Sequence, residues 1–191
     1  MGLLGLSVAV GNDANGAGKS PKTARATLVN ATGKKLGKIR FQAAGKGSLV
    51  VRVSVMGLTP GFHGFHVHQT GKCEAPFTTA GGHYNPTNQI HGAHAGDMPP
   101  LLVGSDGRAS AQFKTTSLTF SGLVDAQGDR NAVIIHAGPD NLANIPSHYH
   151  AHTPDASSTT FGADAATKAT GDSGARAVCG VIRRVKSAQH G

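Results

Sequence analysis

Hydrophobic and polar residues alternate along several short stretches of the chain. In one of them apolar side chains take every second position, at Leu49, Val51, Val53 and Val55. A period of two is that of a strand with one buried face. The alternation recurs in three further sets: Ala24, Ala26 and Leu28; Ile39, Phe41 and Ala43; and Ala109, Ala111 and Phe113. We expect a half-buried strand at each set.

Turn-forming residues separate these stretches. The chain has 27 Gly and 9 Pro but no Trp, a composition that favours short strands joined by turns over a bundle of helices. Two apolar runs in the second half, NAVIIHAG and AVCGVIRRV, predict additional strands. The pattern as a whole predicts an all-β fold, either a sandwich or a flattened barrel.

The length of 191 residues fits a single domain, and no internal repeat divides it. Residues 1–10 are apolar, but the run is too short for a membrane span and lacks the basic start of a signal peptide. Residues 12–20 are rich in Gly, Asn and Ala. We expect residues 1–20 to be a flexible leader or signal remnant, residues 21–191 to form the β domain, and the chain to have no membrane span.

Positive charge is concentrated in the N-terminal half. The formal net charge is +8, and nine basic residues lie between Lys19 and Arg52, whereas Asp13 is the only acidic residue before Glu74. This asymmetry leaves weak binding of a polyanion open. As the explanation of these basic residues we favour a solvent-exposed face, or charged residues that prevent edge strands from pairing with other chains. No nucleic-acid partner is expected, because basic residues are not interleaved with aromatic ones and no nucleic-acid motif is present.

Two cysteines, Cys73 and Cys179, lie far apart and outside any C-x-x-C arrangement. This spacing argues against a thiolate zinc site. The two residues are either one long-range disulfide or two unrelated buried thiols. Export would favour the disulfide, since such bonds persist in oxidising compartments. We expect a periplasmic, cell-envelope or extracellular protein, although a signal segment is not clear.

Histidines supply the candidate chemistry. In FHVH, His66 and His68 are two positions apart, so on a strand both imidazoles leave the same face. A third histidine, His136, lies in the apolar run VIIHAG, where an imidazole without a partner would be costly. These positions suggest a chelating set on rigid strands.

A polar loop, GGHYNPTNQIHGAHAGD, supplies four more candidates: His83, His91, His94 and Asp97. Together with the strand histidines they exceed the needs of one tetrahedral ion, so we expect two adjacent sites. Imidazoles from strands suit a redox copper, whereas three histidines and one aspartate suit a closed zinc site. His83 is the natural candidate to bridge the two metals.

The ordered motifs GFHVHQTGKC, AGGHYNP, HAGDMP, VIIHAGPDN and TGDSGARAVCGVI cover most of the chain from Gly61 to Ile182. In these motifs the sequence resembles the copper-zinc superoxide dismutases, of a bacterial type with a shortened zinc loop. The resemblance implies a Greek-key β-barrel of about eight antiparallel strands with long loops, and this family is itself a known example of the sandwich architecture. It implies an enzyme that converts two superoxide anions into O2 and hydrogen peroxide.

The resemblance also implies roles for individual residues. Copper would be held by His66, His68, His83 and His136. Zinc would be held by His83, His91, His94 and Asp97. Asp140 would join the two metal sites, Cys73 and Cys179 would form the disulfide, and Arg176 and His83 would act in catalysis.

Several departures qualify what the resemblance implies. Only two residues separate His91 from His94, so the zinc loop is trimmed, although one tight turn can still close a site. Lysines that would guide superoxide are mostly absent from residues 137–175, so steering would rest on Arg176 and the overall charge. A noncatalytic copper/zinc-binding barrel is the alternative function, but it should have lost a ligand or the arginine. A homodimer is left open.

The remaining histidines have other expected roles. His63 should tie loops together by hydrogen bonds. The group His148, His150 and His152 forms HYHAH in a polar loop, where exposure is favoured over binding of an extra ion. His190 lies close to the C-terminal end of the sequence and is assigned no role.

Overall fold

The computed structural model describes residues 21–124, 131–145 and 162–186. Residues 1–20, 125–130, 146–161 and 187–191 lie outside the described residues, among them the predicted leader, the HYHAH group and His190.

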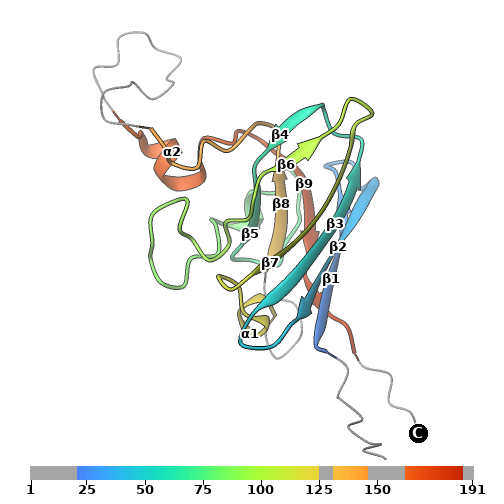
Figure 1. The fold of residues 1–191 in the computed structure, drawn as a ribbon. Coiled ribbons are helices and arrows are strands. Elements are labelled where there is room, and N and C mark those ends of the chain that lie inside the picture. Colours follow the sequence, from blue (N-terminus) through green and yellow to red (C-terminus); the bar gives the residue numbers. More distant parts are fainter. Residues whose placement is uncertain (1–20, 125–130, 146–161, 187–191) are drawn as a thin grey trace, which may run out of the picture.

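Antiparallel strands make up most of the regular secondary structure and curl into a barrel-like sheet (Figure 1). Seven strands follow the order β5-β8-β9-β1-β2-β3-β7, and β10, paired to β1, is the eighth strand of this sheet, while β4 and β6 form a separate ribbon. The strands are β1 (Thr23–Val29), β2 (Lys35–Ala43), β3 (Leu49–Met56), β4 (Gly61–His63), β5 (Phe65–His68), β6 (Leu101–Val103), β7 (Arg108–Thr115), β8 (Ala132–His136), β9 (Arg176–Val181) and β10 (Arg183–Arg184). Some neighbouring strands are not consecutive in the sequence: β3 pairs with β7, and β5 pairs with β8. Such long connections between neighbouring strands are typical of a Greek key.

The predicted alternation is confirmed. The four apolar residues of β3, from Leu49 to Val55, are all buried, whereas Arg52 and Ser54 between them are exposed. The apolar sides of β1 and β2 face the same core, which Phe65 and Val67 of β5 also enter. Ala43, Ala111 and Phe113 pack against this core but are only partly buried.

Short elements were not foreseen from the sequence. The structure has two short helices, α1 (Phe120–Leu123) and α2 (Ala165–Thr170), and a 3₁₀ turn, η1 (Thr78–Ala80). It also has more strands than the eight expected. The additional strands are short: β4, β6 and β10 are only two or three residues long. α2 begins after Asp164, whose carboxylate accepts a hydrogen bond from Thr167 N (2.8 Å), and ends at Gly171 with φ of 65°. Among the described residues no helix is long and apolar enough to cross a membrane.

A second, smaller apolar cluster lies on the outer side of β8. It contains Ala132 and Ile134, whose neighbours Val133 and Ile135 point the other way, into the main core. Phe77, Ala80 and Cys179 complete it. The predicted disulfide is confirmed, since Cys73 and Cys179 are bonded with their Cα atoms 5.7 Å apart. The bond fastens the segment before η1 to β9.

We predict that replacing both cysteines by serine lowers the free energy of unfolding of the metal-free protein. The bond joins residues 106 positions apart, and restricting an unfolded chain over a loop of that size is worth about 2–5 kcal/mol. Urea denaturation of the metal-free parent and variant measures the difference. The control is a thiol count on denatured, unreduced parent protein, and two free thiols there would contradict the bond.

Candidate metal centre

Strands β5 and β8 place three histidines on one face. Along β5 the apolar Phe65 and Val67 face the core, so His66 and His68 must face outward. His136 ends β8, which pairs with β5. All three imidazoles are buried, because loops cover this outer face.

The loop of residues 81–97 runs along the free edge of β5. Val67 N donates to Gly96 O and Tyr84 N donates to Val67 O, both at 2.8 Å. Gly96 is required at this crossing, because a Cβ there would collide with the Val67 carbonyl oxygen. The contact sets Asp97 opposite His66.

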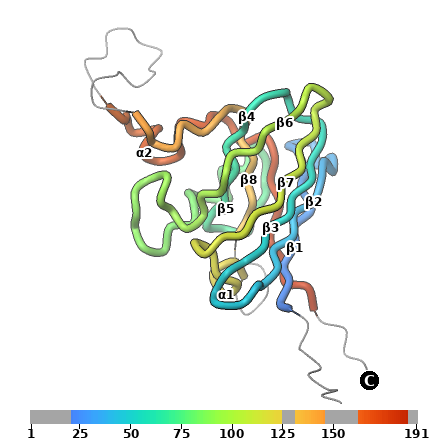
Figure 2. Tube along the Cα trace, viewed as in Figure 1, coloured from blue at the N-terminus to red at the C-terminus, as the bar shows by residue number. Residues whose placement is uncertain are grey.

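The trimmed segment from His91 to Asp97 folds as successive turns. Asp97 N donates to His94 O (3.1 Å), and the Asp97 carboxylate accepts from the backbone N–H groups of Gly92 (2.8 Å) and His94 (3.0 Å). Two successive turns, closed by Ala93 N to Ile90 O and by Asp97 N to His94 O, replace the single tight turn expected, and they bring His91, His94 and Asp97 to one side. In Figure 2 this loop, drawn in green, and α2 project from the same side of the barrel.

Two groups of potential ligand atoms result, each with its atoms within 4.8 Å of one another. The first group consists of His66, His68, His83 and His136; the second consists of His83, His91, His94 and Asp97. His83 belongs to both, and its ring centroid lies 4.0 Å from that of His66 and 5.2 Å from that of His91. These are the two sets that the sequence analysis assigned to copper and to zinc.

Three histidines of the first group are oriented in the same way. His66 Nε2–H donates to Asp140 Oδ2 (2.6 Å), His68 Nδ1–H to Gly81 O (2.9 Å), and His136 Nδ1–H to Gly174 O (3.0 Å). The other ring nitrogen of each is buried with no hydrogen-bond partner. Each unpartnered nitrogen therefore carries a lone pair, and these nitrogens lie close to one another.

In the second group His91 follows the same rule, whereas His83 turns its partnered nitrogen toward the other members. His83 Nδ1 lies 2.9 Å from Asp97 Oδ1 and 3.3 Å from His94 Nδ1, while its Nε2 has no partner. His91 Nε2–H donates to Asp140 Oδ1 (2.8 Å), and its Nδ1 is likewise unpartnered. Five buried nitrogens without partners would be costly in an apolar interior, but neutral imidazole nitrogens are ligands for copper and zinc. The residues fit two adjacent metal ions.

Burial keeps three of these imidazoles, those of His68, His83 and His136, neutral. It lowers the pKa of His68 to about 2, and the pKa values of His83 and His136 to about 4. Neighbouring imidazoles act in the same direction, because a charged ring beside them would repel a second one. At neutral pH these three rings therefore remain unprotonated at the nitrogen that faces the centre.

Asp140 joins the two groups by accepting from His66 with one oxygen and from His91 with the other. Burial would raise its pKa, but hydrogen bonds from these two imidazoles lower it well below its usual value. The carboxylate therefore fixes which nitrogen of each ring carries the proton. Gly171, at the end of α2, packs so closely that a Cβ would collide with both Asp140 and His91.

Asp97 is also held in its ionised form. Burial opposes this form, but a hydrogen bond from His83 and the nearby ring of His91 lower the pKa of the carboxyl below its usual value. An ionised aspartate beside three imidazoles is a ligand set suited to zinc.

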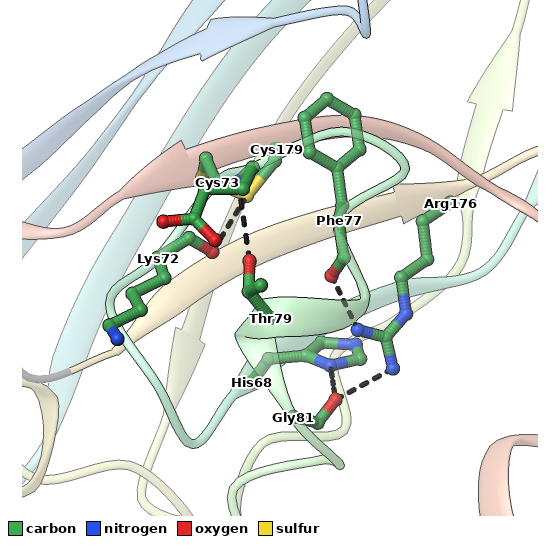
Figure 3. The surroundings of a disulfide bond; sticks show 9 residues. His68, Lys72, Cys73, Phe77, Thr79, Gly81, Arg176 and Cys179 are labelled. Carbon is green, nitrogen blue, oxygen red and sulfur yellow. Dashed lines mark hydrogen bonds between the residues drawn. A yellow bond between two sulfur atoms is a disulfide. The ribbon is translucent and has the colours of Figure 1, made fainter.

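Arg176 is held against the disulfide-linked segment (Figure 3). Its Nη1 donates to Phe77 O and its Nη2 to Gly81 O, both at 2.6 Å. Gly81 O also accepts from His68, so the guanidinium lies beside a ring of the first group. Burial lowers the pKa of Arg176, but a guanidinium keeps its charge in proteins. A fixed positive charge therefore borders the centre.

His63 has the structural part expected of it. Its Nδ1 lies 2.6 Å from His136 O and its Nε2 lies 2.8 Å from Thr59 O. The ring therefore ties the segment before β4 to the end of β8, next to a histidine of the first group.

Sequence reasoning named Asp140 but missed the backbone groups that orient the other side chains. The carbonyl oxygens of Phe77, Gly81 and Gly174 are backbone atoms, which no motif of side chains reveals. Gly171 could have been found, because Asp164 and Gly171 are typical first and last residues of a short helix.

Comparisons with known proteins agree with this site. Residues 35–182 match the family model for copper/zinc superoxide dismutase (SODC). The chain is 39% identical over 170 residues to "Superoxide dismutase [Cu-Zn]" of Mycobacterium bovis, covering 82% of this chain and 68% of that one. It is 34% identical over 158 residues to "Superoxide dismutase [Cu-Zn] 3" of Arabidopsis thaliana, covering 80% and 85%.

Solved structures give the same result for the fold. The clock protein EA4 superposes with a TM-score of 0.68 at 25% identity, over 86% of this chain and 95% of that one. A SOD-like protein from Bacillus subtilis superposes with a TM-score of 0.62 at 31% identity, over 82% and 96%. On the family model, the relatives and the fold together, the chain belongs to the copper/zinc superoxide dismutase family.

Proposed function

We propose that the two groups of side chains hold copper and zinc in adjacent sites and that superoxide is dismutated there. The observation that carries this proposal is the convergence of five buried ring nitrogens, none with a hydrogen-bond partner, on two ligand sets that share His83. Membership of the family supports the reaction, in which two superoxide anions and two protons give O2 and hydrogen peroxide.

The first group would hold copper through His66 Nδ1 and the Nε2 atoms of His68, His83 and His136, because these are the unpartnered nitrogens. Copper bound there supplies a Cu(II)/Cu(I) couple that takes an electron from one superoxide and gives it to another. The second group would hold zinc through His91 Nδ1, together with His83, His94 and Asp97. Only His83 offers a nitrogen to each group.

His83 is proposed to bridge the metals and to act as the proton carrier. Its Nδ1 is fixed beside Asp97 and His94, which would keep the ring in place whether or not Nε2 is bound. Nε2, which has no hydrogen-bond partner, could then hold a proton and deliver it to the peroxide product.

Arg176 is proposed to receive the anion. A guanidinium has five N–H donors, and within the described part of the chain two of them are used, on Phe77 O and Gly81 O. The remaining donors and the fixed charge can bind superoxide beside His68. The two carbonyl oxygens set the position of the guanidinium before the substrate arrives.

Three further properties of the protein are proposed on less direct grounds. The disulfide and the mycobacterial relative support work in an oxidising compartment outside the cytoplasm, which fractionation of the source cells tests. The excess of basic residues in the N-terminal half supports weak polyanion binding.

A homodimer would cover Phe62 and Leu102, an exposed cross-strand pair on β4 and β6, and sedimentation velocity tests it.

Metal removal should abolish the activity, and copper should restore it. We expect chelation to lower superoxide consumption to the level of buffer, and copper addition to zinc-loaded protein to recover it, because only copper changes valence here. Activity per bound copper, with both metals measured, is the readout. Fully loaded protein no more active than free copper would instead support a noncatalytic metal-binding barrel.

Arg176→Ala should lower turnover while leaving copper content near that of the parent. Loss of a hydrogen bond from a charged group costs about 1.5–3 kcal/mol, about one to two decades in rate. Steady-state rates at measured copper content test this. Arg108→Ala is the matched control, since Arg108 is exposed and begins β7, near Asp106. Equal turnover in the Arg176 variant would refute the role.

Asp97→Ala should lose zinc selectively. The carboxylate belongs only to the second group, so the copper ligands remain in place. Metal analysis after reconstitution with both ions should give near one zinc per chain in the parent and little in the variant. Asp106→Ala, which removes an exposed carboxylate, should behave as the parent. Active parent protein with copper but negligible zinc would show that the trimmed loop holds no zinc.

A further inference from the structure

A row of arginines crosses the outer face of the sheet. Strand register places Arg25 of β1 opposite Arg40 of β2, and Arg40 opposite Arg52 of β3. Arg183 of β10 stands opposite Arg25 at one end, and Gln112 of β7 stands opposite Arg52 at the other. Adjacent strands are about 4.8 Å apart, so the three positions on β1, β2 and β3 extend over about 10 Å. We call Arg25, Arg40 and Arg52 the arginine row.

No acidic residue belongs to the strands that carry the row. The sequences of β1, β2, β3, β7 and β10 contain neither Asp nor Glu. The side-chain partners of Arg52 are the amide oxygens of Gln112 (2.7 Å) and Gln42 (3.4 Å), and Arg40 donates to the Thr23 hydroxyl (3.4 Å). These partners are neutral, so they leave the charge of Arg40 and Arg52 unbalanced.

The location of the row rules out one of the two explanations favoured from the sequence. Charged guards protect the edges of sheets, but β1, β2 and β3 are interior strands of the order given above. The second explanation, a solvent-exposed face, requires only polar residues. It does not explain why like charges stand directly opposite one another, because that arrangement destabilises a sheet. An anionic partner does give a reason for it.

The surface over the row is hollowed. A cavity of about 950 Å³ is lined by Arg25, Arg40 and Arg52, with Lys38, Ser54 and Gln112 beside them. A hollow admits a linear polymer more readily than the plane of a membrane. Its lining contains no aromatic residue, so it offers no platform on which nucleic-acid bases could stack.

We propose that the arginine row binds a linear acidic polysaccharide through its sulfate or phosphate esters. The proposal deepens the weak polyanion binding proposed above and rests on it. Guanidinium groups bind such esters through two parallel hydrogen bonds, and the hydroxyl and amide groups of Ser54 and Gln112 suit sugar hydroxyls. A polysaccharide is favoured over a nucleic acid because the lining lacks aromatic residues and because an exported protein meets such polymers.

The row and the metal centre use different parts of the barrel. The metal ligands lie on β5, β8 and the loops that project beside them, whereas the row lies across β1, β2 and β3 (Figures 1 and 2). Polymer bound to the row would therefore leave the metal face open to superoxide. Binding and dismutase activity can be measured separately.

Retention of the metal-loaded protein on immobilised dextran sulfate tests the proposal, with neutral dextran as the blank. The triple variant Arg25→Gln, Arg40→Gln, Arg52→Gln should bind about tenfold or more weakly at low salt, because three charge-assisted contacts are lost. The matched control is Lys34→Gln, Lys35→Gln, Lys46→Gln, which removes the same charge at or beside the two hairpin turns. It should keep most of the affinity. Both variants should keep the parent's dismutase activity per copper.

Different results would overturn different statements. Absence of any binding by the parent would refute both the weak polyanion binding and the row. Equal losses in the two triple variants would mean that net charge alone acts, and would overturn the row. Tighter, row-dependent binding to duplex DNA or to anionic lipid vesicles would replace the polysaccharide with that partner. Should the arginine triple variant unfold, the single variants Arg40→Gln and Lys46→Gln make the same comparison.

Discussion

The structure depends on a constraint of hydrogen bonding. An imidazole has two ring nitrogens, and burying one without a partner is costly. In three rings, those of His66, His68 and His136, one nitrogen is hydrogen-bonded to a protein oxygen, and the other nitrogens lie close together without a partner. The protein thereby fixes each ring's tautomer in advance, and a cation is the partner that satisfies the remaining lone pairs. Strands, loops and disulfide all serve to hold this arrangement.

The oxygens that fix the rings come from segments far apart in the sequence. Asp140 and Gly174 flank the long loop after β8, whereas Gly81 follows η1. Gly81 O also holds Arg176, and the segment that carries it is bonded to β9 through Cys73. One carbonyl oxygen therefore couples a proposed copper ligand, the guanidinium and the disulfide. A shift of this segment would move all three together.

The strands and the histidines could be predicted from the sequence because both follow from local pattern. The period of two in β3 determines which side chains are buried, and the same period in FHVH sets His66 and His68 on one face. The trimmed loop was also foreseeable in outline, since His91, His94 and Asp97 recur at every third position. The contacts that orient the rings could not be foreseen, because the carbonyl oxygen of Gly81 and the close approach of Gly171 arise only from tertiary packing.

Charge was the least predictable property, for a physical reason. The sequence shows an excess of basic residues, but their meaning depends on which strands are neighbours. Arg25, Arg40 and Arg52 are far apart along the chain and become adjacent only through the pairing of β1, β2 and β3. Register therefore converts a diffuse charge into a line of guanidinium groups. The same pairing keeps the line away from β5 and β8, so a change in the charged surface need not disturb the metal centre.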